Sequence, residues 1–407
     1  MSEAAHTFAA PPAPRSIYVA FEVFPRPKGA SSHIAAMVTA LAENRGPVWL
    51  LCCGFADMPA WQREGDIVIH RFKVHHPNLL RRAKEFGDFV FGRLAGLKTP
   101  PGLCVFRDPW GGWPALSALP DTPAVFEVNG LPSWELDYAY PALRNNPVLR
   151  IKIEEIERHC LDSADAVATV SEVTRAALIG LGVDGGRISV VPNSASDVFF
   201  NAPNGPGPDY LRAGRWFGYV GSLHPWQGLD LLIKAWAAAA GDLPETRLLV
   251  VHNGRRKPLK VLKKQIRKLG LVDRVLLQSP LPPDALADVI SRLEFTVAPL
   301  TETVRNTVQG CCPIKIVESM AAGTPVLASD LQVTRDLITH DLDGHLVPPG
   351  RSRPLALAIR QLSGDDSQRN RLAHRCRETA RTRFTRRVMF DKLEAIFQSA
   401  SSAPKRS

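Results

Sequence analysis

The sequence predicts an α/β protein with two Rossmann-like domains, and three observations indicate this fold class. Short apolar runs of β-prone residues alternate with helical patterns along the chain. The alternation stops in Asn201 to Gly214, a segment dense in Pro, Gly and Asn that has the composition of a linker. After it, the same alternation begins again. Each half therefore predicts a parallel sheet that helices cover on both faces.

Composition places the chain among soluble globular proteins. Hydrophobic residues make up 45% and charged residues 22% of its 407 residues, a length that allows two or three domains. No apolar run approaches the roughly 20 residues of a membrane span. The first residues, M-S-E-A-A-H, lack the basic start and apolar core of a signal peptide. We expect a cytoplasmic protein whose residues 1–14 are disordered.

Net charge and cysteine usage limit the partners. The formal charge of +10 suits nucleic acid, an anionic membrane or phosphorylated substrates. Arg255 to Lys268 holds eight basic residues and no acid, and is either a solvated helix face or an anion-binding surface. It contains no aromatic residue for base stacking, so nucleic acid is the least favoured partner. The seven cysteines lack the paired spacing of a zinc site, and we expect no metal.

The first half opens with a strand and a helix that together resemble the start of a nucleotide-binding domain. Ser16 to Phe21 reads as a buried strand, and a helix is expected from about His33 to Ala42. Gly29 lies in the loop between them and would let the backbone approach a ligand closely. Further strands are expected at Val48–Cys52, Ile67–Phe72, Cys104–Phe106, Val125–Val128, Ala166–Val170 and Ile188–Val191.

One segment of the first half leaves two interpretations open. His75 to Lys98 mixes basic residues with Leu, Phe and Val. As a helix it would either lie on anionic lipid or pack on the core with its basic residues at the rim. Three glycines weaken it as a surface helix, which favours packing on the core.

The second half repeats this architecture. Trp216 to Val220 is expected as a strand, and Leu229 to Ala239 as an amphipathic helix. Further strands are expected at Arg247–Val251, Arg274–Gln278, Phe295–Ala298 and Gly344–Val347. A last helix, Arg386 to Phe397, carries an apolar face that must pack on one of the domains.

The most informative stretch runs from Gly310 to Asp330. Pro313 can begin a helix, Gly323 can end it, and a short β-prone run follows. The first turn of such a helix offers unpaired N–H groups and a partial positive charge, to which Lys315 adds a full charge. Glu318 lies one turn further along, where its carboxylate could accept hydrogen bonds from sugar hydroxyls. The group suits a nucleoside diphosphate, although an ordinary amphipathic helix would show the same pattern.

Several segments in order resemble the family 4 retaining glycosyltransferases, which have the two-domain GT-B fold. These segments are S-A-D-A-V-A-T-V-S-E-V-T-R, R-I-S-V-V-P-N-S-A-S-D-V-F, G-Y-V-G-S-L-H-P-W-Q-G and P-I-K-I-V-E-S-M-A-A-G-T-P-V-L-A-S-D. The resemblance covers about 16–397. It implies two domains that face each other across a cleft, with the last helix crossing back to the first. We therefore expect a disordered start (1–14), an acceptor domain (15–202), a linker (203–214), a nucleotide-sugar domain (215–384), and the returning helix and tail (385–407).

The resemblance also implies donor-binding residues. Glu318 matches the second Glu of the family's Glu-seven residues-Glu motif, which binds the ribose, while Gly310 stands at the first Glu. Ser222 and Gln227 occupy the loop where many members place a diphosphate-binding Arg and Lys. A leaving diphosphate needs preorganised positive charge. We assign Lys315 and Arg305 to the phosphates, with Ile314 of the helix start, Asn306 and Gln309 beside the donor.

The acceptor side is expected in the first domain. Glu127 and Asn129 end an apolar strand, and ligands bind such sheets at the carboxyl ends of their strands. Glu127 is assigned to orient the acceptor, although it could instead cap the following turn. His33 is a further candidate. The resemblance implies that the leaving phosphate accepts the acceptor's proton, so no protein base is assigned.

The leading hypothesis is retaining transfer of a sugar from a nucleoside-diphosphate sugar to a glycan, a lipid-linked glycan or a small hydroxyl acceptor. It needs no cofactor or metal, and it could take place at the inner face of the cell membrane. The replaced residues motivate a second hypothesis, a protein that binds nucleotide or glycan without turnover. A nucleotide-sugar epimerase of the same fold is a third.

Overall fold

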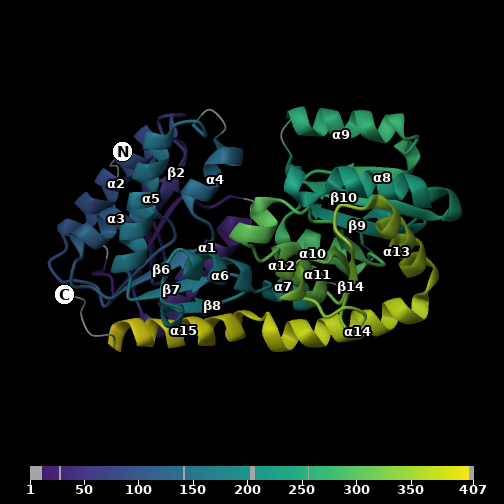
Figure 1. The fold of residues 1–407 in the computed structure, drawn as a ribbon. Coiled ribbons are helices and arrows are strands. Elements are labelled where there is room, and N and C mark those ends of the chain that lie inside the picture. Colours follow the sequence, from purple (N-terminus) through teal and green to yellow (C-terminus); the bar gives the residue numbers. More distant parts are fainter. Residues whose placement is uncertain (1–11, 27–28, 141–142, 202–206, 255, 403–407) are drawn as a thin grey trace, which may run out of the picture. The chain divides into compact units, whose positions relative to one another are not determined.

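The structure is a computed structural model that describes residues 12–26, 29–140, 143–201, 207–254 and 256–402. Two compact α/β units form, each with its own sheet and helices (Figure 1). The first contains the described residues up to Ala168, then Val183–Ser189 and the chain from Leu393. The second contains Thr169–Gly182 and Val190–Lys392. The prediction of two Rossmann-like domains is confirmed.

The first sheet has eight strands in the order β3-β4-β2-β1-β5-β6-β7-β8. Its strands are β1 (Ser16–Val23), β2 (Val48–Gly54), β3 (Trp61–Glu64), β4 (Ile67–Lys73), β5 (Leu103–Phe106), β6 (Ala124–Val128), β7 (Ala166–Thr169) and β8 (Ile188–Val190). Every residue of β2 is buried, as expected of a central parallel strand with both faces covered. All of the strands predicted for this half form, within one to three residues.

Five helices accompany this sheet: α1 (Gly29–Arg45), α2 (Leu79–Ala95), α3 (Pro109–Ala118), α4 (Pro132–Ala139) and α5 (Pro147–Ser163). The side chain of Asn78 caps α2, and its Leu79, Ala83, Phe86, Val90 and Leu94 are buried. The segment 75–98 therefore packs one face on the core, the interpretation favoured from its glycines.

The sequence analysis did not predict strand β3. It pairs antiparallel with β4 at the edge of the sheet, whereas β4, β2, β1, β5 and β6 pair in parallel. Its residues W-Q-R-E lack a buried apolar face, so no hydrophobic pattern marks them as a strand. The expectation of a purely parallel sheet is wrong for this edge.

The second sheet has six parallel strands in the order β11-β10-β9-β12-β13-β14. They are β9 (Arg215–Gly221), β10 (Thr246–His252), β11 (Val275–Gln278), β12 (Thr296–Ala298), β13 (Val326–Ser329) and β14 (His345–Val347). The helices of this unit are α6 (Glu172–Gly180), α7 (Asp197–Phe200), α8 (Leu229–Ala239), α9 (Arg256–Lys268), α10 (Pro283–Ser291), α11 (Ile314–Ala321), α12 (Gln332–Arg335), α13 (Ser352–Gly364) and α14 (Asp366–Arg383).

The boundary between the units differs from the one expected at residue 202. Val170 and Phe199 belong to the apolar core of the second unit, where they share a cluster with Ile316 and Met320 of α11. Burial of these side chains draws 169–182 and 190–201 away from the first unit. Residues 1–11 of the expected disordered start, residue 202 and residues 203–206 of the expected linker lie outside the described residues.

The C-terminal helix α15 (Arg386–Ser402) joins the first unit from Leu393 onward. Leu393 and Phe397, two residues of the predicted apolar face, are fully or almost fully buried. The guanidinium of Arg45 in α1 lies over the Phe397 ring, and its Nη2 is 3.3 Å from Glu394 Oε1. None of the described helices is both long and apolar enough to span a bilayer.

The packing of α15 yields a prediction for stability. Phe397→Ala removes a completely buried ring and should lower the free energy of unfolding of the first unit by about 3–5 kcal/mol. Phe91→Ala in α2 is the matched control, since 46% of that side chain is exposed and its loss should cost less than about 1 kcal/mol. Thermal denaturation and hydrogen exchange of α15 measure both. Equal effects of the two variants would show that α15 does not depend on this contact.

Candidate functional site

The candidate donor site is built on the start of α11. Pro313 stands at the N-cap with extended backbone, and no side chain caps the helix. Ile316, Val317 and Met320 anchor it in the core, and Gly323, with φ +76°, follows its end as predicted. The first-turn N–H groups are therefore available to a ligand.

Lys315 contributes a buried positive charge to this helix start. Its Nζ is out of contact with solvent and has no hydrogen-bond partner among the described residues. It lies 4.3 Å from the centre of the Tyr219 ring, and a Cβ on Gly221 would be 3.0 Å from it. Burial lowers the pKa of Lys315 to about 7, and Cys311 opposes this shift only in part. The ammonium thus lies at the end of β9, where the loop that contains Ser222 and Gln227 begins.

Glu318 lies one helical turn beyond Lys315. Its side chain is half-buried and forms no hydrogen bond or ion pair in the described part of the chain. Burial raises its pKa to about 8. Residues three apart share a helix face, yet Lys315 does not pair with this carboxylate. An amine and a carboxyl group are therefore held close on one helix, each without a partner among the described residues, which is an arrangement suited to a polar ligand.

The segment before α11 contains a π-helical turn, Arg305–Gln309. Arg305 Nη1 donates to the carbonyl of Gly310 over 2.8 Å. Asn306 is 1% exposed, and its Nδ2 donates to the carbonyls of Trp226 (2.9 Å) and Thr301 (2.8 Å). The two N–H groups of this amide hold two loops together, so its position fits a scaffold role better than the expected contact with a sugar. Gln309 is fully buried.

Gly310 explains why the first Glu of the family motif is missing. Its φ is +80°, a conformation that disfavours other residues. A Cβ here would lie 2.5 Å from Ser171 Oγ and Thr174 Oγ1, and 2.7 Å from the backbone N of Thr174. The start of α6 occupies the space into which a Glu side chain would extend.

The loop after β9 holds the two other replaced residues. The carbonyl of Ser222 accepts a 2.6 Å hydrogen bond from the Tyr219 hydroxyl. The buried Oε1 of Gln227 has no hydrogen-bond partner in the part of the chain that the structure describes. Ser222, Gln227 and Ile314 are each half-buried as whole residues, so the loop and the start of α11 are partly accessible. Gly29, assigned to the donor, begins α1 in the first unit.

Glu127 forms the centre of a buried polar cluster in the first unit. It is 3% exposed and accepts hydrogen bonds from the Tyr18 hydroxyl and the Asn129 amide. His33 Nε2 lies 2.7 Å and Arg107 Nη1 3.3 Å from its Oε1. Burial opposes the charge, but His33, Arg107 and the hydrogen bonds outweigh it and lower the pKa of Glu127 to about 2.

The structure thus brings together Glu127, Asn129 and His33, the three residues assigned to the acceptor side. Glu127 itself is occupied by its neighbours, which favours a role in positioning His33 and Arg107. Sequence reasoning missed Tyr18 and Arg107. Arg107 directly follows β5, and Glu127 lies near the end of the adjacent β6. Because ligands bind such sheets at the carboxyl ends of their strands, Arg107 could have been found in the same way as Glu127.

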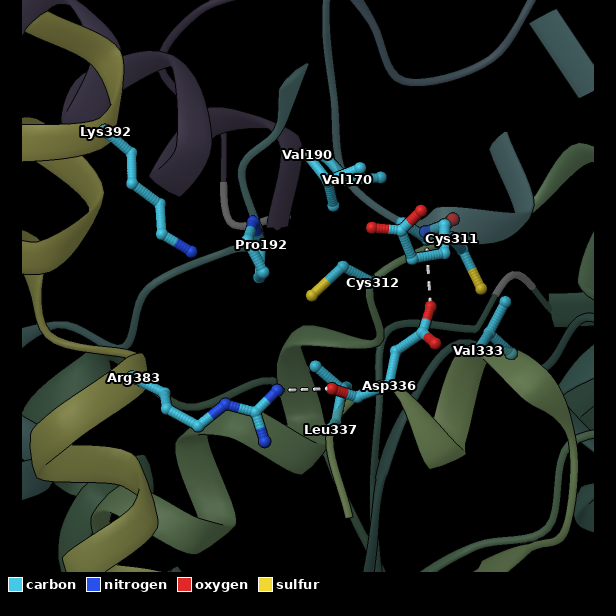
Figure 2. Close-up of a pocket in the computed structure, with 12 residues that line it drawn as sticks. Val170, Val190, Pro192, Cys311, Cys312, Val333, Asp336, Leu337, Arg383 and Lys392 are labelled. Atoms are coloured by element: carbon cyan, nitrogen blue, oxygen red, sulfur yellow. Dashed lines mark hydrogen bonds between the residues drawn. The ribbon is translucent and has the colours of Figure 1, made fainter. Parts of the chain in front are cut away.

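A cavity of about 210 Å³ lies in the second unit, beside the segment that leads into α11 (Figure 2). Its walls include Cys311, Cys312, Arg383 and Lys392, together with the carboxylates of Glu172 and Asp336. Asp336 Oδ2 accepts from the backbone N–H of Glu172 over 3.2 Å, and its carbonyl accepts from Arg383 Nη2 over 2.6 Å. Because a carboxylate already occupies the start of α6, we do not assign the donor phosphates to this cavity.

One group of described residues has side chains with metal-ligand character. His345 Nδ1 lies 2.7 Å from Asp341 Oδ1, and His340 Nε2 lies 3.3 Å from Asp341 Oδ2. His340 Nδ1 also accepts from the backbone N–H of Leu346. Asp341 contacts both imidazoles, of which that of His340 is exposed and that of His345 is buried, and none of the three residues belongs to the donor site.

The crowding at Gly310 generates a testable prediction. Gly310→Ala forces a Cβ against α6 and should cost about 2–4 kcal/mol of stability from overpacking and backbone strain together. Gly364→Ala is the control, since nothing lies within 4 Å of its added Cβ. Chemical denaturation compares them. A stability of Gly310→Ala equal to that of the parent would refute the steric explanation.

Two family models match consecutive parts of the chain. Residues 28–194 match the model of a glycosyl transferase 4-like domain, and residues 214–383 match that of glycosyl transferases group 1. The two matches fall in the two halves predicted from the sequence.

Curated relatives are between a quarter and a third identical to this chain over the aligned residues. A phosphatidyl-myo-inositol mannosyltransferase of Mycobacterium leprae is 27% identical over 215 residues, 52% of this chain and 54% of that protein. A D-inositol 3-phosphate glycosyltransferase of Thermobispora bispora is 30% identical over 155 residues, 36% of this chain and 34% of that protein. The chain thus spans between a third and just over half of these relatives.

Solved structures share the fold. Sucrose-phosphate synthase from Thermosynechococcus elongatus superposes with a TM-score of 0.78 at 18% identity, over 94% of this chain and 98% of that one. Anabaena HepE, in complex with UDP-glucose, gives a TM-score of 0.69 at 18% identity, over 95% and 100%. These structures show the GT-B fold, and the two family models, which together match most of the chain, show that it belongs to the family 4 glycosyltransferases.

Proposed function

We propose that this protein transfers a sugar from a nucleoside-diphosphate sugar to a hydroxyl acceptor, with retention at the anomeric carbon. The observation that carries the proposal is the Lys315 ammonium, which is buried without a counter-charge among the described residues, beside the uncapped start of α11. A diphosphate supplies that counter-charge.

The chemistry follows from the charge that develops as the donor breaks. The leaving nucleoside diphosphate carries about two to three negative charges, and fixed positive groups out of water stabilise it strongly. Lys315 and the N–H groups of α11 provide such groups. The ammonium lies at the end of β9, so it replaces the Arg and Lys that relatives carry in the following loop. Arg305 is the second candidate for the phosphates.

The remaining donor contacts extend this arrangement. Glu318 accepts hydrogen bonds from the ribose hydroxyls, and bound in this way its carboxylate is ionised. Ile314 contributes a backbone N–H, Ser222 and Gln227 line the loop, and Gln309 is a further candidate for the sugar. In the first unit, Gly29 is the candidate for donor binding. The leaving phosphate accepts the acceptor's proton, so neither a protein base nor a metal is required.

The names of similar proteins guide the choice of substrates. Anabaena HepE has been solved with UDP-glucose, which makes a uridine diphosphate sugar the first donor to test. Relatives named for phosphatidyl-myo-inositol and D-inositol 3-phosphate suggest a phosphorylated or lipid-linked acceptor. The net charge of +10 suits an anionic acceptor. On the acceptor side, Glu127 positions His33 and Arg107 next to Asn129. The enzyme would work on the cytoplasmic side of the membrane, attached to its surface.

Binding without turnover is the second candidate function. The replacement of three usual donor-binding residues by Gly310, Ser222 and Gln227 favours it. Calorimetry that detects nucleotide binding, with no nucleoside diphosphate released across a panel of donors and acceptors, would support this alternative over transfer.

The donor assignment predicts the effect of two substitutions. Lys315→Ala and Glu318→Ala should each lower kcat/KM for donor hydrolysis or transfer by about a hundredfold or more, because each removes a contact to the bound nucleotide. Neither variant should melt earlier than the parent, since each removes a buried charge without a partner.

Two exposed residues serve as matched controls for this experiment. Lys234→Ala and Glu302→Ala remove the same side chains from the surface of the same unit and should leave turnover unchanged. Release of nucleoside diphosphate is the measurement. Full activity in Lys315→Ala or Glu318→Ala would refute the assignment of that residue.

A further inference from the structure

Helix α9 packs one face on the second unit. Its Leu262 and Ile266 are buried in the apolar cluster that contains Trp236 of α8. Gln265 Nε2 donates to the carbonyl of Asp230 at the start of α8 over 3.0 Å. Figure 1 shows α9 lying along the outside of α8, at the surface of this unit. The apolar residues of the predicted pattern therefore fix which side of α9 faces the solvent.

The solvent face of α9 is strongly cationic. Seven of its thirteen residues are basic and all seven are exposed: Arg256, Lys257, Lys260, Lys263, Lys264, Arg267 and Lys268. None of them forms an ion pair within the described ranges of the chain. At 3.6 residues per turn they occupy an arc of about 140° opposite Leu262 and Ile266. The sequence contains an eighth basic residue, Arg255, outside the described residues.

This face opposes helix formation. Lys260 and Lys264 are four residues apart, as are Lys263 and Arg267, and like charges at that spacing repel. Some exposed basic residues elsewhere in the unit have acidic partners, such as Lys234 with Asp230 and Arg335 with Asp330. Concentration of unpaired charge on one face, with no structural benefit to the helix, indicates an extended anionic partner.

We propose that α9 docks the second unit onto a bilayer that contains anionic phospholipid. The helix presents a rod of about 20 Å, long enough to lie over several headgroups. Val261 is exposed at one edge of the cationic arc, and the exposed Leu269 and Val272 follow the end of the helix. Such side chains can enter the boundary between headgroups and acyl chains, while the lysines reach the phosphates. A polynucleotide would gain nothing from them, and α9 has no aromatic residue for base stacking.

This inference deepens the proposed function, because it brings the enzyme to the surface where a lipid-linked acceptor would be found. It rests on residues separate from those assigned to the donor. Donor binding and membrane binding can therefore fail independently.

The test compares two charge reversals in the full-length protein. Lys260→Glu/Lys264→Glu and Arg371→Glu/Arg381→Glu change the net charge equally, and the second pair lies exposed and unpaired among the described residues of α14. Cosedimentation with phosphatidylcholine vesicles, with and without phosphatidylglycerol, gives the partition coefficients. We expect the parent to bind only the vesicles with phosphatidylglycerol, and less tightly as salt increases.

The α9 variant should partition at least about tenfold more weakly, while the α14 variant stays close to the parent. The variant Lys260→Arg/Lys264→Arg should bind like the parent. The increase in melting temperature on addition of UDP should be the same in all variants, which separates this proposal from the donor site. Equal losses in the two reversals, no preference for phosphatidylglycerol, or tighter binding to duplex DNA than to these vesicles at the same salt would each overturn it.

Discussion

The ammonium of Lys315 is a positive charge that neither water nor an acidic side chain of the described residues compensates. Desolvation of this kind is costly, and the depressed pKa of about 7 reflects it. The ring of Tyr219 offers partial compensation through its π face. A buried charge of this kind can be kept when the surrounding packing fixes its position. A ligand of opposite charge then offsets the free energy of desolvation. Perturbed groups of this type concentrate at functional sites.

The changes from the family pattern form one consistent set around this charge. Gly310 lets the segment before α11 pack against Ser171 and Thr174, which excludes a Glu at that position. Asn306 and Arg305 use their side chains to hold the same segment through backbone carbonyls. Ser222 and Gln227 leave the loop after β9 without a cation, and Lys315 supplies one from the neighbouring helix. Loss of the usual residues is therefore compatible with a retained donor site.

Much of the fold could be predicted from the sequence because its signals are local. Pro313 and Gly323 mark the ends of α11, and continuous apolar runs mark the central strands such as β2. Strand β3 carries no such signal, since it pairs with β4 through the backbone and a side-chain hydrogen bond from Arg71 to Gln62, without a buried apolar face. The placement of Phe199 in the second unit depends on long-range packing. The composition of the segment, from which the linker was predicted, carries no information on such packing.

Long-range contacts were also the part of the candidate site that could not be predicted from the sequence. The sequence identified Lys315 and Glu318 by their place on a helix, but their burial and lack of partners depend on residues far away in the chain. Glu127 was found from its strand end, whereas its contacts with Tyr18 and Arg107 join three strands and became visible only in the folded sheet. Asparagine is suited to sugar binding, yet the side-chain amide of Asn306 donates its hydrogen bonds to the carbonyls of Trp226 and Thr301.

Proton uptake on nucleotide binding tests the central claim most directly. At pH 8 the free Lys315 amine is mostly neutral, and a diphosphate beside it should raise its pKa and restore its charge. Glu318→Gln is the background for the experiment, because it removes the opposing titration of that carboxyl. Calorimetric titration with UDP in two buffers of different ionisation enthalpy should then show uptake of roughly one proton, and Lys315→Met should abolish it. A binding enthalpy independent of the buffer, or equal uptake in the Lys315→Met variant, would contradict the account.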